Sequence, residues 1–143
     1  MAAYALRSAR VDDLARLARL FDQLGHPQPA GALRGSLESV LGDPRAGVIV
    51  AHSDGQLLGA AAFCFVPVPH ETRPWCRITA LVIDEAHRGD GIGRTLVEAV
   101  QVAARDAGCS RIEATSALHR ADAHRFYVKL GYGQTSTHFL KRL

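Results

Sequence analysis

The sequence predicts an α/β protein in which a mixed sheet carries helices on both faces, in the order β-αα-βββ-α-β-α-β. Apolar runs typical of strands alternate along the chain with segments whose apolar residues recur at helical spacing. The helix that begins at Ile92 connects two of these strands, and such a crossover makes the two strands parallel. The 143 residues suffice to bury one core, so we expect a single domain over residues 1–143.

The elements of the first half follow from local patterns. Asp12 and Asp13 favour the first turn of a helix, where carboxylates interact well with the helix dipole. Gly25 to Pro29 ends that helix, and Ser53-Asp54-Gly55 is typical of a hairpin turn. The elements expected here are a strand over 4–7, a helix to about residue 24, a second helix over 33–41, and strands over 48–51 and 57–66.

The second half alternates strand and helix. A fourth strand is expected over 78–83, and a long helix follows from Ile92 to about Ala107, ended by Gly108. Residues 111–116 then form the fifth strand, parallel to the fourth, and parallel neighbours of this kind can splay at their C-terminal ends. A short helix that carries Tyr127 and a last strand around Phe139-Leu140 complete the order.

Composition excludes several classes of protein. The net charge of +3 comes mainly from scattered arginines, without the cluster typical of nucleic-acid binders. The longest apolar run, Leu57 to Val66, is too short to span a bilayer. The three cysteines and seven histidines show neither disulfide nor metal spacing. We therefore expect a cytoplasmic protein with no membrane segment, no nucleic-acid partner and no metal.

Arg88-Gly89-Asp90-Gly91-Ile92-Gly93 lies between the fourth strand and the long helix. Glycines at a helix start leave backbone N–H groups uncovered, and these groups with the helix dipole favour an anion. Arg88 and Arg94 add positive charge. A nucleotide P-loop would need lysine where Arg94 stands, and a dinucleotide-binding loop spaces its glycines differently. An anion such as a phosphate is therefore predicted at this loop.

The pattern Arg-x-x-Gly-x-Gly after a strand resembles the acetyl-CoA pyrophosphate loop of the GCN5-related N-acetyltransferases (GNAT). A second stretch, residues 123–132, resembles the later motif of that family, a short helix with a tyrosine that ends in Gly-aromatic. Gly131 suits a left-handed helix cap there. The version with His124 and Arg125 before Phe126-Tyr127 looks most like the branch of aminoalkylphosphonate N-acetyltransferases.

The resemblance implies an enzyme that transfers acetyl from acetyl-CoA to a primary amine by direct attack, most simply a small molecule. The main chain of the fourth strand would hold the pantetheine arm, and the glycine loop would hold the pyrophosphate. The cofactor-binding residues implied are Leu81, Val82, Ile83, Arg88, Gly89, Asp90, Gly91, Ile92, Gly93 and Arg94.

Tyr127 is implied as the general acid that protonates the departing thiolate, although it and Phe126 could both be core aromatics. Many relatives carry a glutamate on the fourth strand where this chain has Ala80, so the base is unassigned. Glu71, and beside it His70, are the candidates from the preceding loop. Arg120 replaces an asparagine that contacts the cofactor in relatives.

The loop 70–75 also suggests how an acceptor is recognised. Glu71 could bind an ammonium group, Arg73 an anionic group such as a phosphonate, and Trp75 could form an aromatic wall. Three other functions stay open, namely a protein N-terminal acetyltransferase, a non-catalytic acyl-CoA-binding sensor and a nucleotide-binding regulatory domain. A homodimer is also left open.

Overall fold

The computed structural model describes residues 3–115 and 121–143. Its chain divides into two compact units, residues 1–113 (unit 1) and 114–143 (unit 2). A mixed sheet runs in the order β1-β2-β3-β4-β5, with β4 and β5 parallel, as the sequence predicts. The strands are β1 (Ala5–Ser8), β2 (Ala46–Ser53), β3 (Gln56–Val66), β4 (Trp75–Ile83) and β5 (Arg111–Ala114).

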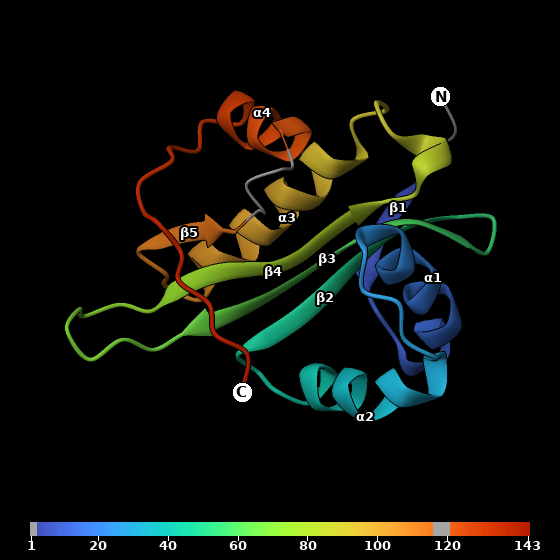
Figure 1. Ribbon diagram of the computed structural model, residues 1–143, viewed down its shortest axis with the longest axis horizontal. Helices are drawn as coiled ribbons and strands as arrows, with labels where there is room; N and C mark the ends of the chain where they lie inside the picture. The colour runs from blue at the N-terminus through green and yellow to red at the C-terminus, as the bar shows by residue number, and fades with distance from the viewer. Residues whose placement is uncertain (1–2, 116–120) are drawn as a thin grey trace. The chain divides into compact units, whose positions relative to one another are not determined.

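Three helices of unit 1 cover the two faces of this sheet, as Figure 1 shows. Helices α1 (Leu14–Leu24) and α2 (Ala30–Leu41) pack against each other and against β2, β3 and β4. Helix α3 (Ile92–Asp106) lies on the opposite face, against β2, β3 and β4. Two 3-10 turns, Val11–Asp13 and Glu85–His87, precede α1 and α3.

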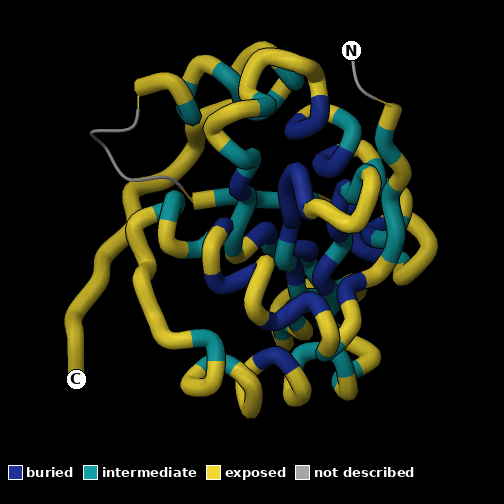
Figure 2. Tube along the Cα trace, turned by 90° about the vertical axis from the view of Figure 1, so that its right-hand side faces the viewer, coloured by how far each residue is buried: buried dark blue, intermediate teal, exposed yellow. Residues whose placement is uncertain are grey.

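The core on the α1/α2 face is built from aliphatic side chains of both helices and of the central strands. Leu17 is 1% exposed and Val50 is fully buried. The buried cluster comprises Ala9, Leu14, Leu17, Leu20, Leu37, Val48, Val50, Leu57, Ala60 and Val82. Figure 2 shows buried residues on the inward faces of the helices and exposed residues on their outward faces. This is the pattern of amphipathic helices that pack on a sheet.

On the other face α3 approaches the sheet closely at Gly59 of β3. A Cβ atom at Gly59 would lie 3.2 Å from Leu96 of α3 and 2.8 Å from Ile83 of β4. Glycine is therefore required here because any side chain would push the helix away from the strand. Leu96, Val97 and Val100 of α3 are fully buried. The close approach at Gly59 therefore positions the N-terminal half of α3 against the sheet.

Strand β4 contains a β-bulge at Thr79. Its antiparallel partners on β3 run Ala62↔Ala80 and then Phe63↔Ile78, so Thr79 has no opposite residue. An extra residue of this kind bends a strand and increases its twist. The exposed side chain of Thr79 marks the place where β4 changes direction, midway between its two ends.

Unit 2 contains α4 (Ala121–Lys129), followed by a left-handed Gly131 with φ of +91°, as predicted. The predicted last strand around Phe139-Leu140 is wrong, because residues 133–143 have no regular secondary structure. Phe139 is 89% and Leu140 71% exposed, and a strand of this kind would need burial on one face to fix its pairing. Strand β5 ends at Ala114, so its predicted extension is wrong at Thr115, whereas Ser116 and Arg120, the departure from the family's asparagine, lie outside the described residues.

Candidate functional site

The glycine loop begins where β4 ends and leads into α3. Asp84 caps the 3-10 turn by accepting a hydrogen bond from the N–H of Ala86 at 3.4 Å. Gly89 and Gly91 then take left-handed conformations, with φ of +87° and +81°, and no atom lies within 4 Å of a Cβ built on either. Gly91 is the residue before the first turn of α3. The loop therefore turns twice through conformations that glycine adopts readily, and its backbone stays uncovered.

Main-chain donors gather at this turn. The first bond of α3 runs from the N–H of Thr95 to the carbonyl of Gly91 at 3.2 Å. The N–H groups of Ile92, Gly93 and Arg94 precede that bond, so the helix itself supplies no acceptor for them. Together with the helix dipole they form a site for an anion, and α3 is 15 residues long, which gives the dipole its full effect.

The two predicted arginines differ in how they are held. Arg88 is exposed and donates from Nε to the carbonyl of Ile83 at 3.2 Å, which fixes its side chain beside the end of β4. Arg94 donates from Nε to Glu98 one turn along α3 at 3.0 Å, so part of its charge is neutralised. Arg88 is consequently the stronger source of positive charge at the loop.

The main chain of β4 presents donors and acceptors toward the edge opposite β3. The N–H of Asp84 bonds the carbonyl of Leu58 on β3 at 2.8 Å. Hydrogen-bonded pairs alternate along an antiparallel ladder, so Val82 bonds β3 whereas Leu81 and Ile83 direct their groups away from it. The backbone groups of Leu81 and Ile83, rather than those of Val82, are therefore the ones that point away from β3.

Gln23 of α1 holds the start of the loop, which sequence reasoning missed. Its amide nitrogen donates to Asp84 at 3.3 Å and its amide oxygen accepts from the N–H of Glu85 at 2.9 Å. Burial raises the pKa of Asp84, but the hydrogen bonds from Gln23 and Ala86 and the charge of His87 outweigh that effect and lower it. A glutamine in the last turn of a helix otherwise built from Leu, Ala, Arg, Phe and Asp was the signal available in the sequence.

A second anchor, also missed, joins the start of the chain to the glycine turn. The hydroxyl of Tyr4 donates to Thr95 Oγ1 at 2.9 Å, and Thr95 Oγ1 donates in turn to the carbonyl of Gly91 at 3.0 Å. This relay fixes the left-handed residue from which α3 starts. The loop is thus preorganised from both sides.

Glu71 lies at the other end of β4, in the loop that leads into Trp75. Its carboxylate accepts a hydrogen bond from the Trp75 indole at 2.6 Å and lies 4.0 Å from Arg111, whose guanidinium stacks 3.4 Å over the Trp75 ring. The hydrogen bond from Trp75 lowers the pKa of Glu71. Since β4 has nine residues that rise about 3.3 Å each, its two ends lie roughly 26 Å apart.

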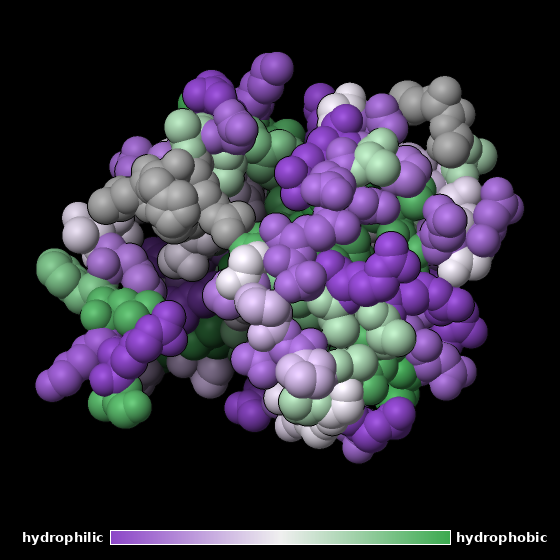
Figure 3. Space-filling model, turned by 45° about the vertical axis from the view of Figure 1, so that its right-hand side comes forward, coloured by the Kyte–Doolittle hydropathy of each residue, from purple (hydrophilic) through white to green (hydrophobic). Residues whose placement is uncertain are grey.

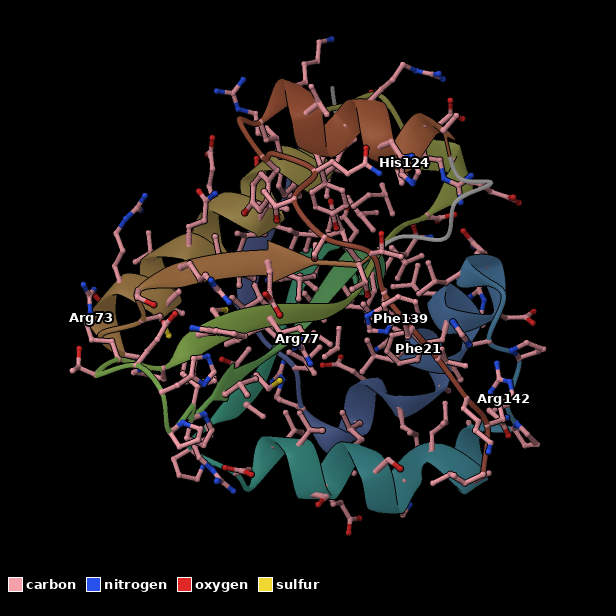
Figure 4. All side chains as sticks on the ribbon, turned by 60° about the vertical axis from the view of Figure 1, so that its left-hand side comes forward. Phe21, Arg73, Arg77, His124, Phe139 and Arg142 are labelled. Atoms are coloured by element: carbon pink, nitrogen blue, oxygen red, sulfur yellow. The ribbon has the colours of Figure 1, made fainter. Side chains whose placement is uncertain are left out.

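Arg73, in the same loop, is also held by local contacts (Figure 4). Its guanidinium donates to the carbonyls of Gly108 and Cys109 at 2.9 and 2.8 Å. Further along β4, Arg77 donates from Nε and Nη2 to Glu113 of β5 at 2.8 and 2.6 Å. These bonds tie the loop and β4 to the segment that enters β5, so the guanidinium of Arg73 is engaged by the chain itself.

Tyr127 lies in the last turn of α4, in unit 2. Its ring packs edge-on against Phe126 and Tyr132, with ring centroids 5.2 and 5.4 Å apart. Burial raises the pKa of Tyr127 to about 12, with a smaller contribution from Tyr132. A tyrosine with the ordinary pKa near 10 is already protonated at neutral pH, so the hydroxyl is a proton donor in either case and burial makes it a weaker acid.

Two absences hold for the residues that the structure describes, 3–115 and 121–143. No group of three or more His, Cys, Asp or Glu side chains in those residues is arranged to hold a metal ion. No helix among them has both the length and the apolar character needed to cross a membrane.

Comparison with known families identifies the chain. The model of the acetyltransferase (GNAT) family matches residues 11–132. The chain belongs to the GNAT family. GNAT acetyltransferases use acetyl-CoA, and the matched range covers both the glycine loop and the Tyr127 helix.

Two relatives with known names support this membership. Aminoalkylphosphonate N-acetyltransferase of Salmonella typhimurium is 31% identical over 112 residues, which cover 78% of this chain and 73% of that protein. N-acetyltransferase 8 of Rattus norvegicus is 31% identical over 103 residues, which cover 72% of this chain. The alignment spans only 46% of the rat protein, about half of its length.

A solved GNAT structure shows the same fold. The aminoglycoside N-acetyltransferase AAC(6')-Iy, in complex with CoA, superposes with a TM-score of 0.88 at 19% identity, covering 100% of this chain and 96% of that one. At this identity the match concerns the fold alone. The predicted family and fold class are thus confirmed, while the roles of individual residues in this GNAT protein rest on the geometry above.

Proposed function

We propose that this GNAT protein is an N-acetyltransferase that moves acetyl from acetyl-CoA to a small primary amine by direct attack. The observation that carries the proposal is the glycine loop, with its two left-handed glycines at the start of α3 and the uncovered N–H groups that follow. These donors suit a pyrophosphate, which is the anionic part of coenzyme A. The residues from Arg88 to Arg94 would hold it.

The pantetheine arm would add to β4 on the edge opposite β3, along the part of this nine-residue strand that the four-residue β5 leaves unpaired. Leu81 and Ile83 direct their backbone groups toward this edge, so an extended arm with its own amides can pair there in the manner of an added strand. Such pairing would carry the thioester from the glycine loop toward the bulge at Thr79. The amine must then approach the thioester carbonyl close to that bulge.

Tyr127 is proposed as the general acid for the thiolate. Its place between Phe126 and Gly131 resembles the later motif of the family, and a tyrosine hydroxyl is a proton donor at neutral pH. We also propose that units 1 and 2 together make one catalytic domain, because the family model extends over both. A homodimer and a cytoplasmic location stay predictions from the sequence.

Proton removal from the amine is proposed to proceed without a carboxylate on β4, since Ala80 stands there. Glu71 was the predicted base, but a carboxylate that accepts a hydrogen bond from the Trp75 indole N–H and has a lowered pKa is a weak base at neutral pH. We expect Glu71→Gln to keep kcat within about threefold. A fall of about 100-fold, which is typical of losing a general base, would restore Glu71 to that role.

An acceptor with a phosphonate group stays a candidate on the strength of the similarity to the Salmonella enzyme. The anion was expected at Arg73, but the guanidinium of Arg73 donates to two carbonyls, and Arg88 is proposed to bind the pyrophosphate. A protein N-terminus is the other acceptor predicted, and a non-catalytic acyl-CoA sensor is the alternative from another class. A panel of amines decides among the acceptors.

The test combines calorimetry with a thiol-release assay. Acetyl-CoA is titrated into the protein, and release of coenzyme A is then followed with alkylamines, aminoalkylphosphonates and peptides with free N-termini. Turnover with small amines supports the proposal. Tight acetyl-CoA binding without turnover of any amine or peptide would favour the sensor, and absence of acetyl-CoA binding would contradict both.

A further inference from the structure

We propose that an apolar cavity between the α1/α2 pair and the sheet binds the apolar group of the acceptor, so that the substrates are primary amines carrying an alkyl or aryl group. The inference rests on the proposed function and names its substrate class. It depends on the cavity's lining, its size and its place beside the bulge of β4.

The cavity lies within unit 1 and has a volume of about 230 Å³. Side chains from both helices and from three strands surround it. They are Leu14, Leu17 and Phe21 of α1, Leu33, Ser36, Leu37 and Val40 of α2, Ala46 and Val48 of β2, Ala62, Phe63 and Cys64 of β3, and Thr79 of β4.

The lining has an apolar floor and a polar rim. Leu17, Val48 and Leu37 are 1%, 5% and 8% exposed, whereas Ser36 and Thr79 are exposed. None of the described residues that line the cavity carries a charge. A charged or strongly polar group would lose its hydration inside without compensation, so the floor selects for hydrocarbon.

The size of the cavity suits a substituent of moderate bulk. An engineered apolar cavity of about 150 Å³ stays dry and binds benzene, and this one is larger. An aromatic ring or a short alkyl chain therefore fits. Figure 3 shows polar side chains over most of the visible face with apolar ones between them.

The cavity reaches the strand on which we place the cofactor. Thr79, the bulge residue of β4, stands on its rim, two residues before Leu81. Phe21 of α1 lines the cavity, and Gln23 on the same helix holds the start of the glycine loop at Asp84. A substrate seated with its hydrocarbon inside would thus present its amino group at the rim, near the proposed thioester.

Because the cavity lies on the α1/α2 face of the sheet, its expected occupant is the amine rather than a long acyl chain. Helix α3, whose N-terminus would hold the pyrophosphate, packs on the face opposite α1 and α2. Attack on a thioester lying along the β4 edge requires the amine to arrive from a direction the cofactor leaves open. The α1/α2 face, on which the lining residues Ser36 and Thr79 are exposed, meets that requirement.

A series of amines tests the inference in the intact protein. The kcat/KM with acetyl-CoA is measured for ethylamine, butylamine, hexylamine and phenethylamine. Each methylene that enters the cavity should raise kcat/KM about fourfold, which corresponds to the transfer of one CH₂ out of water. The gain should stop once the cavity is full, because a longer chain must leave its end in water.

Two matched variants separate the cavity from the helix that lines it. Ser36→Phe places a ring at the rim and should flatten the series to less than twofold per methylene. Ser39→Phe makes the same change on the exposed face of α2, at a residue outside the lining, and should leave the series as in wild type. Both sites are exposed, and circular dichroism confirms that each variant is folded.

An activity-independent measurement uses the thiol of Cys64, which lines the cavity and is half-buried. Phenethylamine should slow its alkylation by iodoacetamide at least fivefold, and ethylamine should not, with the modified residue identified by peptide mass spectrometry. This protection without turnover of any amine would support the cavity assignment while contradicting the proposed function.

Three results would overturn the inference. They are equal kcat/KM across the amines, identical behaviour of the Ser36→Phe and Ser39→Phe variants, and loss of hexanoyl-CoA transfer in Ser36→Phe with an unchanged amine series. The last result would assign the cavity to the acyl chain.

Discussion

The hydroxyl of Tyr127 is the group whose chemistry is most directly testable by substitution. Tyr127→Phe keeps the ring among Phe126 and Tyr132 and removes only the proton donor. We expect kcat to fall by about 100-fold or more and the KM for acetyl-CoA to stay nearly constant, because the role is confined to the transition state. Steady-state kinetics at saturating amine measure both.

Tyr132 supplies the matched control for this experiment. It is also a half-buried tyrosine, and its ring contacts that of Tyr127, so Tyr132→Phe removes a hydroxyl from the same aromatic cluster. Activity within threefold of wild type is expected for it. If both variants lose activity equally, the cluster is structural and the acid role of Tyr127 is refuted.

Asp13 is a buried carboxylate, 1% exposed, that holds the N-terminal segment to α1. Arg7 donates to its two oxygens at 2.7 and 2.9 Å, and the N–H of Arg10 donates at 2.8 Å. The hydrogen bonds from Arg7 lower its pKa below the ordinary 3.8, against the opposing effect of burial. A lowered pKa stabilises the fold above the unfolded value, and that stability is lost as the pH falls through the folded value.

Asp13→Asn should therefore lower the free energy of unfolding by about 2 kcal/mol at pH 7, the range for hydrogen bonds to charged groups. The difference from wild type should shrink as the pH falls below about 4. Urea unfolding at pH 7, 5 and 3 measures it, with the exposed neighbour Asp12→Asn as the control. A difference that is constant across this range would contradict the ionic role of Asp13.

At the scale of an element, two substitutions in the glycine turn before α3 distinguish the effect of backbone geometry on acetyl-CoA affinity from the effect of charge. Gly91 has φ of +81° with open space around it, so Gly91→Ala adds only the cost of a left-handed alanine, about 1 kcal/mol. Gly91→Glu adds the same strain and a carboxylate where the pyrophosphate is proposed. Calorimetry should show an acetyl-CoA affinity at least tenfold weaker for the glutamate than for the alanine variant. Equal affinities would place the pyrophosphate elsewhere.

This loop was predictable because its information is local. Glycine is the residue that adopts positive φ readily, and an apolar strand before it with helical periodicity after it fixes the neighbouring elements. The same holds for Gly131, which has the predicted left-handed conformation. Strand β3 was predicted within one residue of Gln56–Val66, because a hairpin turn and proline bound it.

Features that depend on tertiary contacts were beyond such patterns. The bulge at Thr79 arises from pairing with β3, and no local signal marks which residue of an apolar strand is skipped. Glu71 and Arg73 had side chains suited to a substrate, yet both are bound by neighbours. The strand expected at Phe139-Leu140 had suitable β propensity, but propensity without a buried face does not fix a strand.

At the scale of the whole molecule, helix α1 contributes side chains to the core, to the apolar cavity and to the start of the glycine loop. Leu14 and Leu17 belong to the core, Phe21 lines the apolar cavity, and Gln23 holds the start of the glycine loop. A displacement of α1 on filling the cavity would therefore be transmitted to Asp84. The amine and acetyl-CoA sites are for this reason expected to be coupled within unit 1.

The rate at which the Cys76 thiol is alkylated measures how often the sheet opens, and bound acetyl-CoA should make this opening rarer. Its thiol is fully buried on β4, and burial raises its pKa to about 12, so alkylation requires unfolding. A ligand present at 100 times its Kd stabilises the native state by about 2.7 kcal/mol. When the labelling rate follows the equilibrium population of the open state, this stabilisation slows the labelling of Cys76 about 100-fold. Half-buried Cys64 should change far less, because it is accessible without unfolding.

Labelling with iodoacetamide, with and without acetyl-CoA, measures both thiols in one sample by peptide mass spectrometry. If the labelling of Cys76 is indifferent to acetyl-CoA at that concentration, the cofactor does not stabilise the fold that carries the glycine loop, and its assignment to this loop fails.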